Sequence, residues 1–173
     1  MQIYSLGLLN WLTNIIIKPQ KKLFKMNKEF FRNIISTQIP IAWIAGVRLH
    51  SWEDNTVSTK VKYGLLNQNP FKSMFWAVQG MAAEFSSGLM ASAKIQQSGE
   101  NVSMLVLGMQ SKFLKKAVGK IIFTCNQGLE IEQAIKQAIE TKEGVTLIVR
   151  SQGVDEQNDV VSEFEFTWTF KVR

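Results

Sequence analysis

The feature that most constrains the fold is a stretch between residues 71 and 95 whose apolar side chains recur at helical spacing. These side chains cover nearly the whole circumference of the helix that they predict: Phe71, Met74, Phe75, Val78, Met81, Ala82, Phe85, Leu89 and Met90. A helix that is apolar nearly all round is normally a buried helix. The segment Gln97-Ser98-Gly99 is expected to end it. We therefore predict a central helix that the rest of the chain wraps.

The segments on either side of this helix alternate at the period of β-strands. Long strands are predicted from Val102 to about Phe113 and over residues 163–172, where one face carries Phe164, Phe166, Trp168, Phe170 and Val172. Shorter strands are predicted at 41–52, 57–63, 121–125 and 145–150, with turns at 54–55 and 153–159 and one inserted helix over 129–142. Consecutive antiparallel strands around one buried helix predict an α+β domain rather than a doubly wound sheet.

The length of 173 residues suits a single domain, in which residues 1–36 predict a helical extension ahead of a core over 37–173. Pro19 is expected to break or kink this extension. The apolar stretch at 6–17 is too short to span a bilayer, and no basic start or small-residue cleavage site marks a secretory signal. We expect the extension to dock on the domain's own sheet or on a partner subunit. Peripheral membrane contact through this helix is the less favoured alternative.

The net charge of +6 is concentrated in two clusters of basic residues. One cluster lies within residues 18–32, and the other consists of Lys112, Lys115, Lys116 and Lys120. No nucleic-acid-binding motif accompanies either cluster. We therefore expect solvated protein surfaces and no nucleic-acid partner.

The use of cysteine and histidine limits both the location and the chemistry of the chain. A single cysteine, Cys125, excludes an intramolecular disulfide and suggests a reducing, cytoplasmic location. One cysteine and one histidine, His50, cannot supply the three or four ligands that zinc needs. We expect no metal and no cofactor.

Three short motifs accompany this order of elements. Ala45-Gly46-Val47-Arg48-Leu49 opens the first strand, Asn69 stands fifteen positions before Glu84, and Phe113-Leu114-Lys115-Lys116-Ala117-Val118-Gly119 follows the long strand. Over residues 40–173 the chain thus resembles the hot-dog fold of the acyl-CoA thioesterase superfamily. It is also similar to a thioesterase-like branch with a preceding N-terminal helix and a final strand ending like Trp168 to Arg173. The resemblance implies a central helix lying along a curved antiparallel sheet.

The resemblance also implies a site and a substrate. Glu84 would act as the general base or nucleophile towards an acyl-CoA or other acyl thioester, with Asn69 contributed by the other subunit of a homodimer or tetramer. Phe75-Trp76-Ala77 stands where phenylacetate-type enzymes have His-Gly-Gly. Those glycines let the thioester carbonyl approach N–H groups at the helix N-terminus. Because Trp76 is bulky where close approach is wanted, we expect that oxyanion site to be lost or moved.

Glu84 is also singled out by its own surroundings. It is the only acid on an otherwise apolar helix, and a buried carboxylate must be protonated, partnered or beside a water-lined cavity. Its helix neighbours are small and leave room for a ligand or a closely packed helix: Ala77, Gly80, Ser87, Gly88 and Ala91. The alternatives are a structural carboxylate at Glu84 and a cap or turn role for Asn69.

We assign substrate contact to Phe75, Trp76, Ala77 and Gly80, and contact with coenzyme A phosphates to Lys115 and Lys116. Three functions stay open. The first is an acyl thioesterase with a site at a dimer interface. The second is a non-catalytic acyl- or lipid-binding module, and the third is a structural partner that docks on a membrane. The first two differ at Trp76, because hydrolysis is not expected if its ring closes the tunnel mouth.

Overall fold

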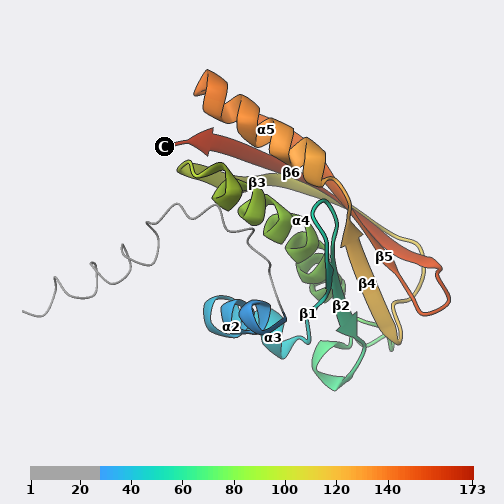
Figure 1. The fold of residues 1–173 in the computed structure, drawn as a ribbon. Helices are drawn as coiled ribbons and strands as arrows, with labels where there is room; N and C mark the ends of the chain where they lie inside the picture. The colour runs from blue at the N-terminus through green and yellow to red at the C-terminus, as the bar shows by residue number, and fades with distance from the viewer. Residues whose placement is uncertain (1–27) are drawn as a thin grey trace, which may run out of the picture.

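The central helix and the curved sheet that the sequence predicts are both present. The computed structural model describes residues 28–173, so the predicted extension is observed only in its last part, as helix α2 (Lys28–Gln38), and the rest lies outside the described residues. The central helix is α4 (Trp76–Ser98), and an antiparallel sheet curves around it (Figure 1). The sheet has the order β1-β2-β4-β5-β6-β3, with β1 (Arg48–Trp52), β2 (Val57–Lys62), β3 (Val102–Phe113), β4 (Lys120–Cys125), β5 (Val145–Val154) and β6 (Val160–Val172).

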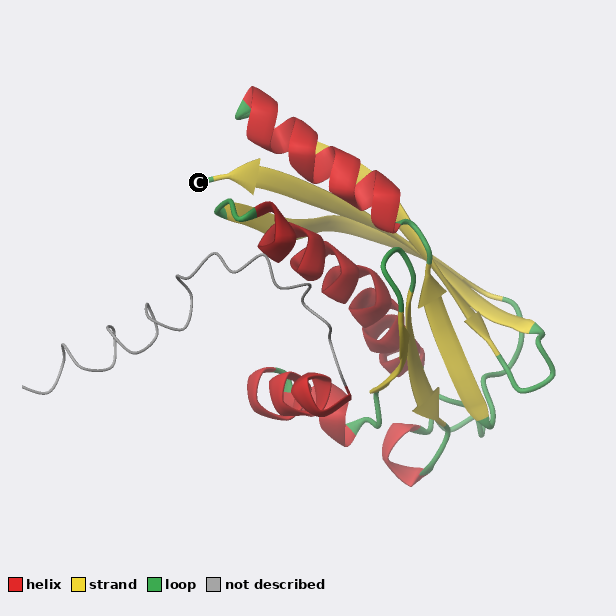
Figure 2. Ribbon diagram, viewed as in Figure 1, coloured by secondary structure: helices red, strands yellow, loops and turns green. Residues whose placement is uncertain are grey.

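The remaining helices pack around this pair of elements. Helix α5 (Gly128–Thr141), the predicted inserted helix, contacts α4, β5 and β6. Helix α2 lies against the flank of α4, where the buried ring of Phe31 meets Phe85 edge-on at 6.2 Å. Two short helices, α3 (Pro40–Ile44) and η1 (Leu65–Asn67), lie at the same end of the molecule (Figure 2). None of the helices in the described part of the chain is long and apolar enough to cross a membrane.

The core is built from the aromatic face of β6 and the small residues of α4. Phe164, Phe166, Trp168 and Phe170 are all buried, as their alternation predicts. Glycines let the helix come close to them: a Cβ added at Gly80 or Gly88 would lie only 3.6 or 3.4 Å from the rings of Phe164 and Trp168. The indole Nε1 of Trp168 also donates a hydrogen bond to the Ser87 hydroxyl at 3.2 Å. Close packing on β6, together with the contacts of α4 with β2, β4 and β5, therefore fixes the position of α4 on the sheet.

The start of the central helix differs from the prediction. Residues 71–75 form a turn, and α4 begins at Trp76 with Phe75 as an extended N-cap residue. The side chain of Asn69 organises this turn, because its Oδ1 accepts the backbone N–H groups of Phe71 and Ser73 at 2.9 and 3.3 Å. The helix ends as predicted, at Gly99 with a left-handed φ of 74°.

The prediction of a single strand over the apolar run at 41–52 was also wrong for the first half of the run. Pro40 stands in the first turn of α3, where its fixed φ favours a helix. Ala42 and Ala45 are buried and Ile41 and Ile44 are exposed, which is a helical and not a strand pattern. Gly46 then turns the chain with φ 95°, and β1 begins only at Arg48. Short apolar runs do not distinguish a strand from a helix by periodicity alone.

Candidate functional site

Glu84 lies on a flank of α4, one helical turn from Gly80 and Gly88, which approach the Phe164 and Trp168 rings of β6. Its side chain is exposed, in contrast to the predicted buried carboxylate, because α4 packs on the sheet through other residues. It is nevertheless the only acid of α4, with Gly80 and Gly88 one helical turn away on either side. The surrounding protein removes enough water to raise the pKa of the Glu84 carboxyl. No described hydrogen bond or ion pair of this carboxyl supports the structural alternative.

The edge strand β3 continues the surface beside Glu84. In the antiparallel register Met109 stands opposite Phe166, and Phe113 stands opposite Ser162. Residues directly opposite in a sheet share a face, so these β3 side chains lie on the same side as the β6 residues under α4. Both Met109 and Phe113 are exposed, and the Ser92 hydroxyl contacts Met104 Sδ at 3.7 Å. We call this surface of α4 and β3 the open face; it is apolar and contains one carboxyl group.

The N-terminus of α4 adjoins a hollow of about 360 Å³. The hollow brings together four of the predicted site residues and two residues that the sequence analysis did not assign to the site: Asn69, Trp76, Lys115 and Lys116, with Ser73 and Gln79. Gln79 is buried and held at both ends of its amide, since Ser162 Oγ donates to its Oε1 at 2.9 Å and its Nε2 donates to the Met74 carbonyl at 3.3 Å. The hollow therefore has a fixed polar wall.

The bulky pair at the start of α4 does not fill this hollow. The rings of Phe75 and Trp76 meet edge-on at 5.7 Å, and Trp76 is 52% exposed. The N–H groups of Trp76 and Ala77 begin the helix and have no acceptor within it. Val78 N–H already bonds Phe75 O at 3.0 Å. The helix terminus thus offers donors and partial positive charge beside the hollow.

The two lysines of the hollow are held by acceptors of the protein itself. Lys115 Nζ lies 2.5 Å from Asp155 Oδ2 and 2.7 Å from Asp159 Oδ2. These bonds raise the pKa of Lys115, and the bond from Lys115 lowers the pKa of Asp155. Lys116 Nζ donates to the Phe71 carbonyl at 3.2 Å. A phosphate at either ammonium would have to compete with these acceptors.

A single chain does not bring Asn69 and Glu84 to one point. Glu84 lies eight residues beyond Trp76, or about 12 Å along the helix axis at about 1.5 Å per residue. Asn69 lines the hollow, and Glu84 is not among the lining residues. The described hydrogen bonds of the Asn69 side chain all stay within its own loop, with Phe71 and Ser73. The turn role considered for Asn69 is therefore present.

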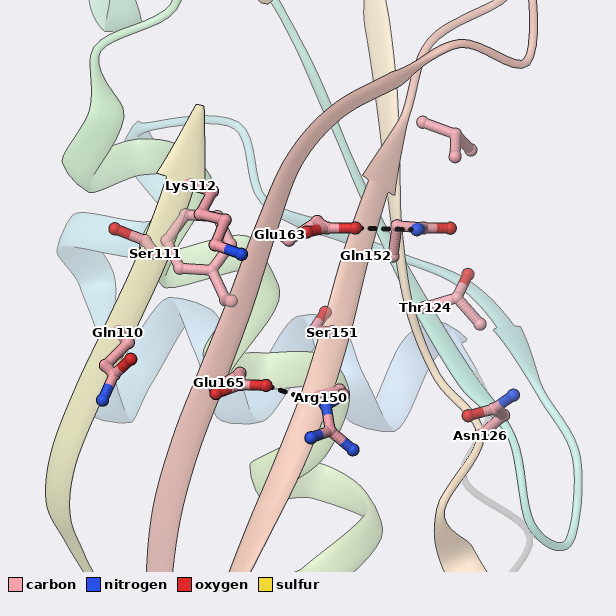
Figure 3. A pocket seen from close by; sticks show the side chains of 12 residues that line it. Gln110, Ser111, Lys112, Thr124, Asn126, Arg150, Ser151, Gln152, Glu163 and Glu165 are labelled. Carbon is pink, nitrogen blue, oxygen red and sulfur yellow. Dashed lines mark hydrogen bonds and ion pairs between the residues drawn. The ribbon is translucent and has the colours of Figure 1, made fainter. Parts of the chain in front are cut away.

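Sequence reasoning missed a second hollow, of about 530 Å³, on the polar face of β3, β5 and β6 (Figure 3). Its charges are largely paired: Arg150 Nε lies 2.8 Å from Glu165, and Gln152 Nε2 donates to Glu163 at 3.4 Å. The only sequence signal was the polar half of the β6 alternation, which indicates a solvated face. Within residues 28–173, no group of three or more His, Cys, Asp and Glu side chains is placed to hold a metal ion.

The chain matches one protein-family model and is similar to several solved structures. Residues 27–170 match the model of a family described as a domain of unknown function, DUF4442. The chain superposes on a Pseudomonas aeruginosa protein of unknown function, PA5026, described as a probable thioesterase, with a TM-score of 0.73, 22% identity and coverage of 87% of this chain and 99% of that chain.

Two further solved structures have a similar fold. A Chlorobaculum tepidum protein with unknown function gives a TM-score of 0.72 at 16% identity, covering 84% of this chain and 94% of its own. A thioesterase from Haemophilus influenzae gives 0.62 at 11% identity, covering 87% and 94%. No curated protein matches the chain significantly. These likenesses confirm the predicted hot-dog fold, with its N-terminal and inserted helices, and at such identities they concern the fold alone.

Proposed function

We propose that this chain, which belongs to the DUF4442 family, binds and hydrolyses an acyl thioester, such as an acyl-CoA, at a site shared between two copies. The observation that carries the proposal is the position of Glu84. It is the single acid of α4, it stands on the open face between two glycines, and its pKa is raised. A carboxylate of raised pKa is a better base than an ordinary one, and perturbed acids are enriched at functional sites.

In the proposed reaction, the Glu84 carboxylate takes a proton from water as the water oxygen attacks the thioester carbonyl carbon. The oxyanion that forms accepts hydrogen bonds from N–H groups at the N-terminus of α4, which Trp76 and Ala77 begin. The carbon–sulfur bond then breaks, and the thiolate receives the proton from Glu84. The products are a carboxylic acid and a free thiol. The Asn69 amide orients the carbonyl group or the water.

The distance between the groups within one chain supports a shared site. The helix terminus and Glu84 of the same α4 are separated by about 12 Å, too far for both to contact one carbonyl group. Strand β3 is one of the two outer strands of the sheet, and such an edge is open to pairing with a second copy. We propose a two-fold pairing through β3 that covers the open face. Glu84 would then work with Asn69 of the partner subunit.

The substitution Glu84→Gln tests the role of the carboxylate. If Glu84 is the base, thiol release from acyl-CoA substrates falls about a hundredfold or more. The wild-type rate rises with pH through the raised pKa of Glu84, since only the ionised form accepts the proton. The matched control is Glu140→Gln, an exposed glutamate on α5, which should hydrolyse like the wild type. Equal rates for Glu84→Gln and the wild type would refute the catalytic role.

Mixing two inactive variants tests the shared site. Asn69→Ala and Glu84→Gln subunits that exchange at equal amounts form about half mixed dimers, each with one intact site of two, so about a quarter of the wild-type rate should return. Neither variant on its own should show this gain in the rate of hydrolysis. Failure to recover after proven exchange, or a monomer by sedimentation at micromolar concentration, would remove the shared-site argument.

A non-catalytic acyl-binding module is the alternative function, and the Phe75–Trp76 ring pair favours it. Small residues at a helix N-terminus allow close approach of a carbonyl group, and these two rings occupy that position. Measurable binding of one acyl-CoA, with no hydrolysis across short, long and aromatic acyl groups, would replace the enzyme by this receptor.

A further inference from the structure

Five large apolar side chains are exposed at one end of the molecule. They come from α3, from η1 and from the turn before α4, and we call them the apolar end: Ile41, Ile44, Leu65, Leu66 and Phe71. Leu65, Leu66 and Phe71 are 81%, 76% and 73% exposed, and Ile41 is 62% exposed. Isolated exposed apolar residues are common, but a group of this size usually marks a contact surface.

The buried side chain of Asn67 holds the three segments of the apolar end together. Its Nδ2 donates to the carbonyls of Ala45, just after α3, and of Lys62, at the end of β2, both at 2.9 Å. Its Oδ1 accepts the Gly64 N–H at 2.9 Å, and its backbone carbonyl accepts the Phe75 N–H at 2.8 Å. With every polar group of the side chain satisfied, the leucines of η1 are displayed by a fixed scaffold and not by a loose loop.

The charge around the apolar end has one sign. No aspartate or glutamate occurs between Asp54 and Glu84, whereas this stretch contains Lys60, Lys62 and Lys72. Lys62 and Lys72 are exposed. The densest basic cluster of the sequence, in residues 18–32, extends into the start of α2, which contains Lys28 and Arg32. The acids of the turn at residues 155–159 are paired with Lys115 and Lys120.

We propose that the apolar end docks this domain on an anionic lipid bilayer. Exposed leucine, isoleucine and phenylalanine side chains surrounded by lysines match an interfacial surface, where the apolar groups enter the acyl region and the ammonium groups meet lipid phosphates. A second copy is the less suitable occupant, because a contact of this end with itself would bring Lys62 and Lys72 of two copies together, and residues 55–83 contain no acid to pair with them. The docking stands independently of hydrolysis. It would also bring the hollow close to the bilayer, since Lys116 in its wall bonds the Phe71 carbonyl.

The test is co-sedimentation of the full-length chain with vesicles of phosphatidylcholine containing phosphatidylglycerol, and with vesicles of phosphatidylcholine alone. The wild type should bind the anionic vesicles more strongly than the neutral ones, and added salt should weaken the binding. The double variant Leu65→Glu/Leu66→Glu should lower the partition coefficient at least about tenfold. The matched control Leu129→Glu/Ile148→Glu places two charges on apolar residues exposed elsewhere, on α5 and β5, and should bind within about twofold of the wild type.

Several results would overturn the proposal. One is a wild type that binds neither vesicle, and another is a Leu65→Glu/Leu66→Glu variant that still binds like the wild type. A third is a variant that keeps vesicle binding but loses self-association in sedimentation, because the surface would then be a contact between copies. Circular dichroism checks that the variants fold. Hydrolysis of a water-soluble short acyl thioester should be unchanged by the double variant, so failure of docking and failure of the proposed reaction are distinguishable.

Discussion

Replacing Phe164 by alanine should be one of the most destabilising single changes in the core. The Phe164 ring is 1% exposed and contacts the rings of Phe113, Phe123 and Phe166 at 5.7, 6.0 and 6.1 Å. Removing a fully buried phenylalanine costs about 3 to 5 kcal/mol in the free energy of unfolding. For a domain of this size, each kcal/mol lowers Tm by about 2 to 4 °C, so a loss of about 4 kcal/mol predicts a fall of about 8 to 16 °C.

Urea unfolding and thermal melts followed by circular dichroism would measure this change. The matched control is Phe113→Ala, because this ring touches Phe164 but is 47% exposed, and its loss should cost about 1 kcal/mol. Phe164 lies beneath Gly80, so the same change should also disturb α4 and the position of Glu84. A loss below about 1 kcal/mol for Phe164→Ala, or equal losses for the two variants, would refute the proposed packing of α4 on β6.

Two further predictions concern groups whose ionisation the fold alters. Burial raises the pKa of the Cys125 thiol to about 11. Iodoacetamide at neutral pH should therefore modify this thiol slowly in the native protein, at the rate at which the protein opens, and quickly in urea. Rapid modification of the native protein would contradict the burial of Cys125. The pKa of Asp155 is lowered, so its stabilising effect is present above the ordinary pKa of an unfolded aspartate and is lost as pH falls through the lowered value. Asp155→Asn should therefore lower Tm at neutral pH, with the difference from the wild type vanishing in acid, whereas a difference that persists in acid would assign the effect to the backbone bonds of the turn.

The parts of the fold that could be predicted are those whose signal is local and periodic. The row from Phe164 to Phe170 alternates strictly, and a period of two has no other common structural meaning. The run at 41–52 has no such period, and its first half became helical because Pro40 and the buried alanines decide its local geometry. The hollow beside α4 could not be predicted, because it depends on how the loop with Asn69 meets the segment with Lys115 across the fold.

The sequence predicts that α4 is buried on all sides, whereas the structure leaves Glu84 exposed. One explanation accounts for both observations. The sequence makes α4 apolar nearly all round, which is typical of helices without a solvent-exposed side. Within one chain, Glu84 is still exposed and Met81 is only half-buried, and Met109 and Phe113 of the outer strand β3 are exposed as well. A sequence pattern records every surface that is buried in the working molecule, including one buried between copies. The difference agrees with the proposed second copy over the open face, under which Glu84 would gain the enclosed surroundings that the proposed acid–base role requires.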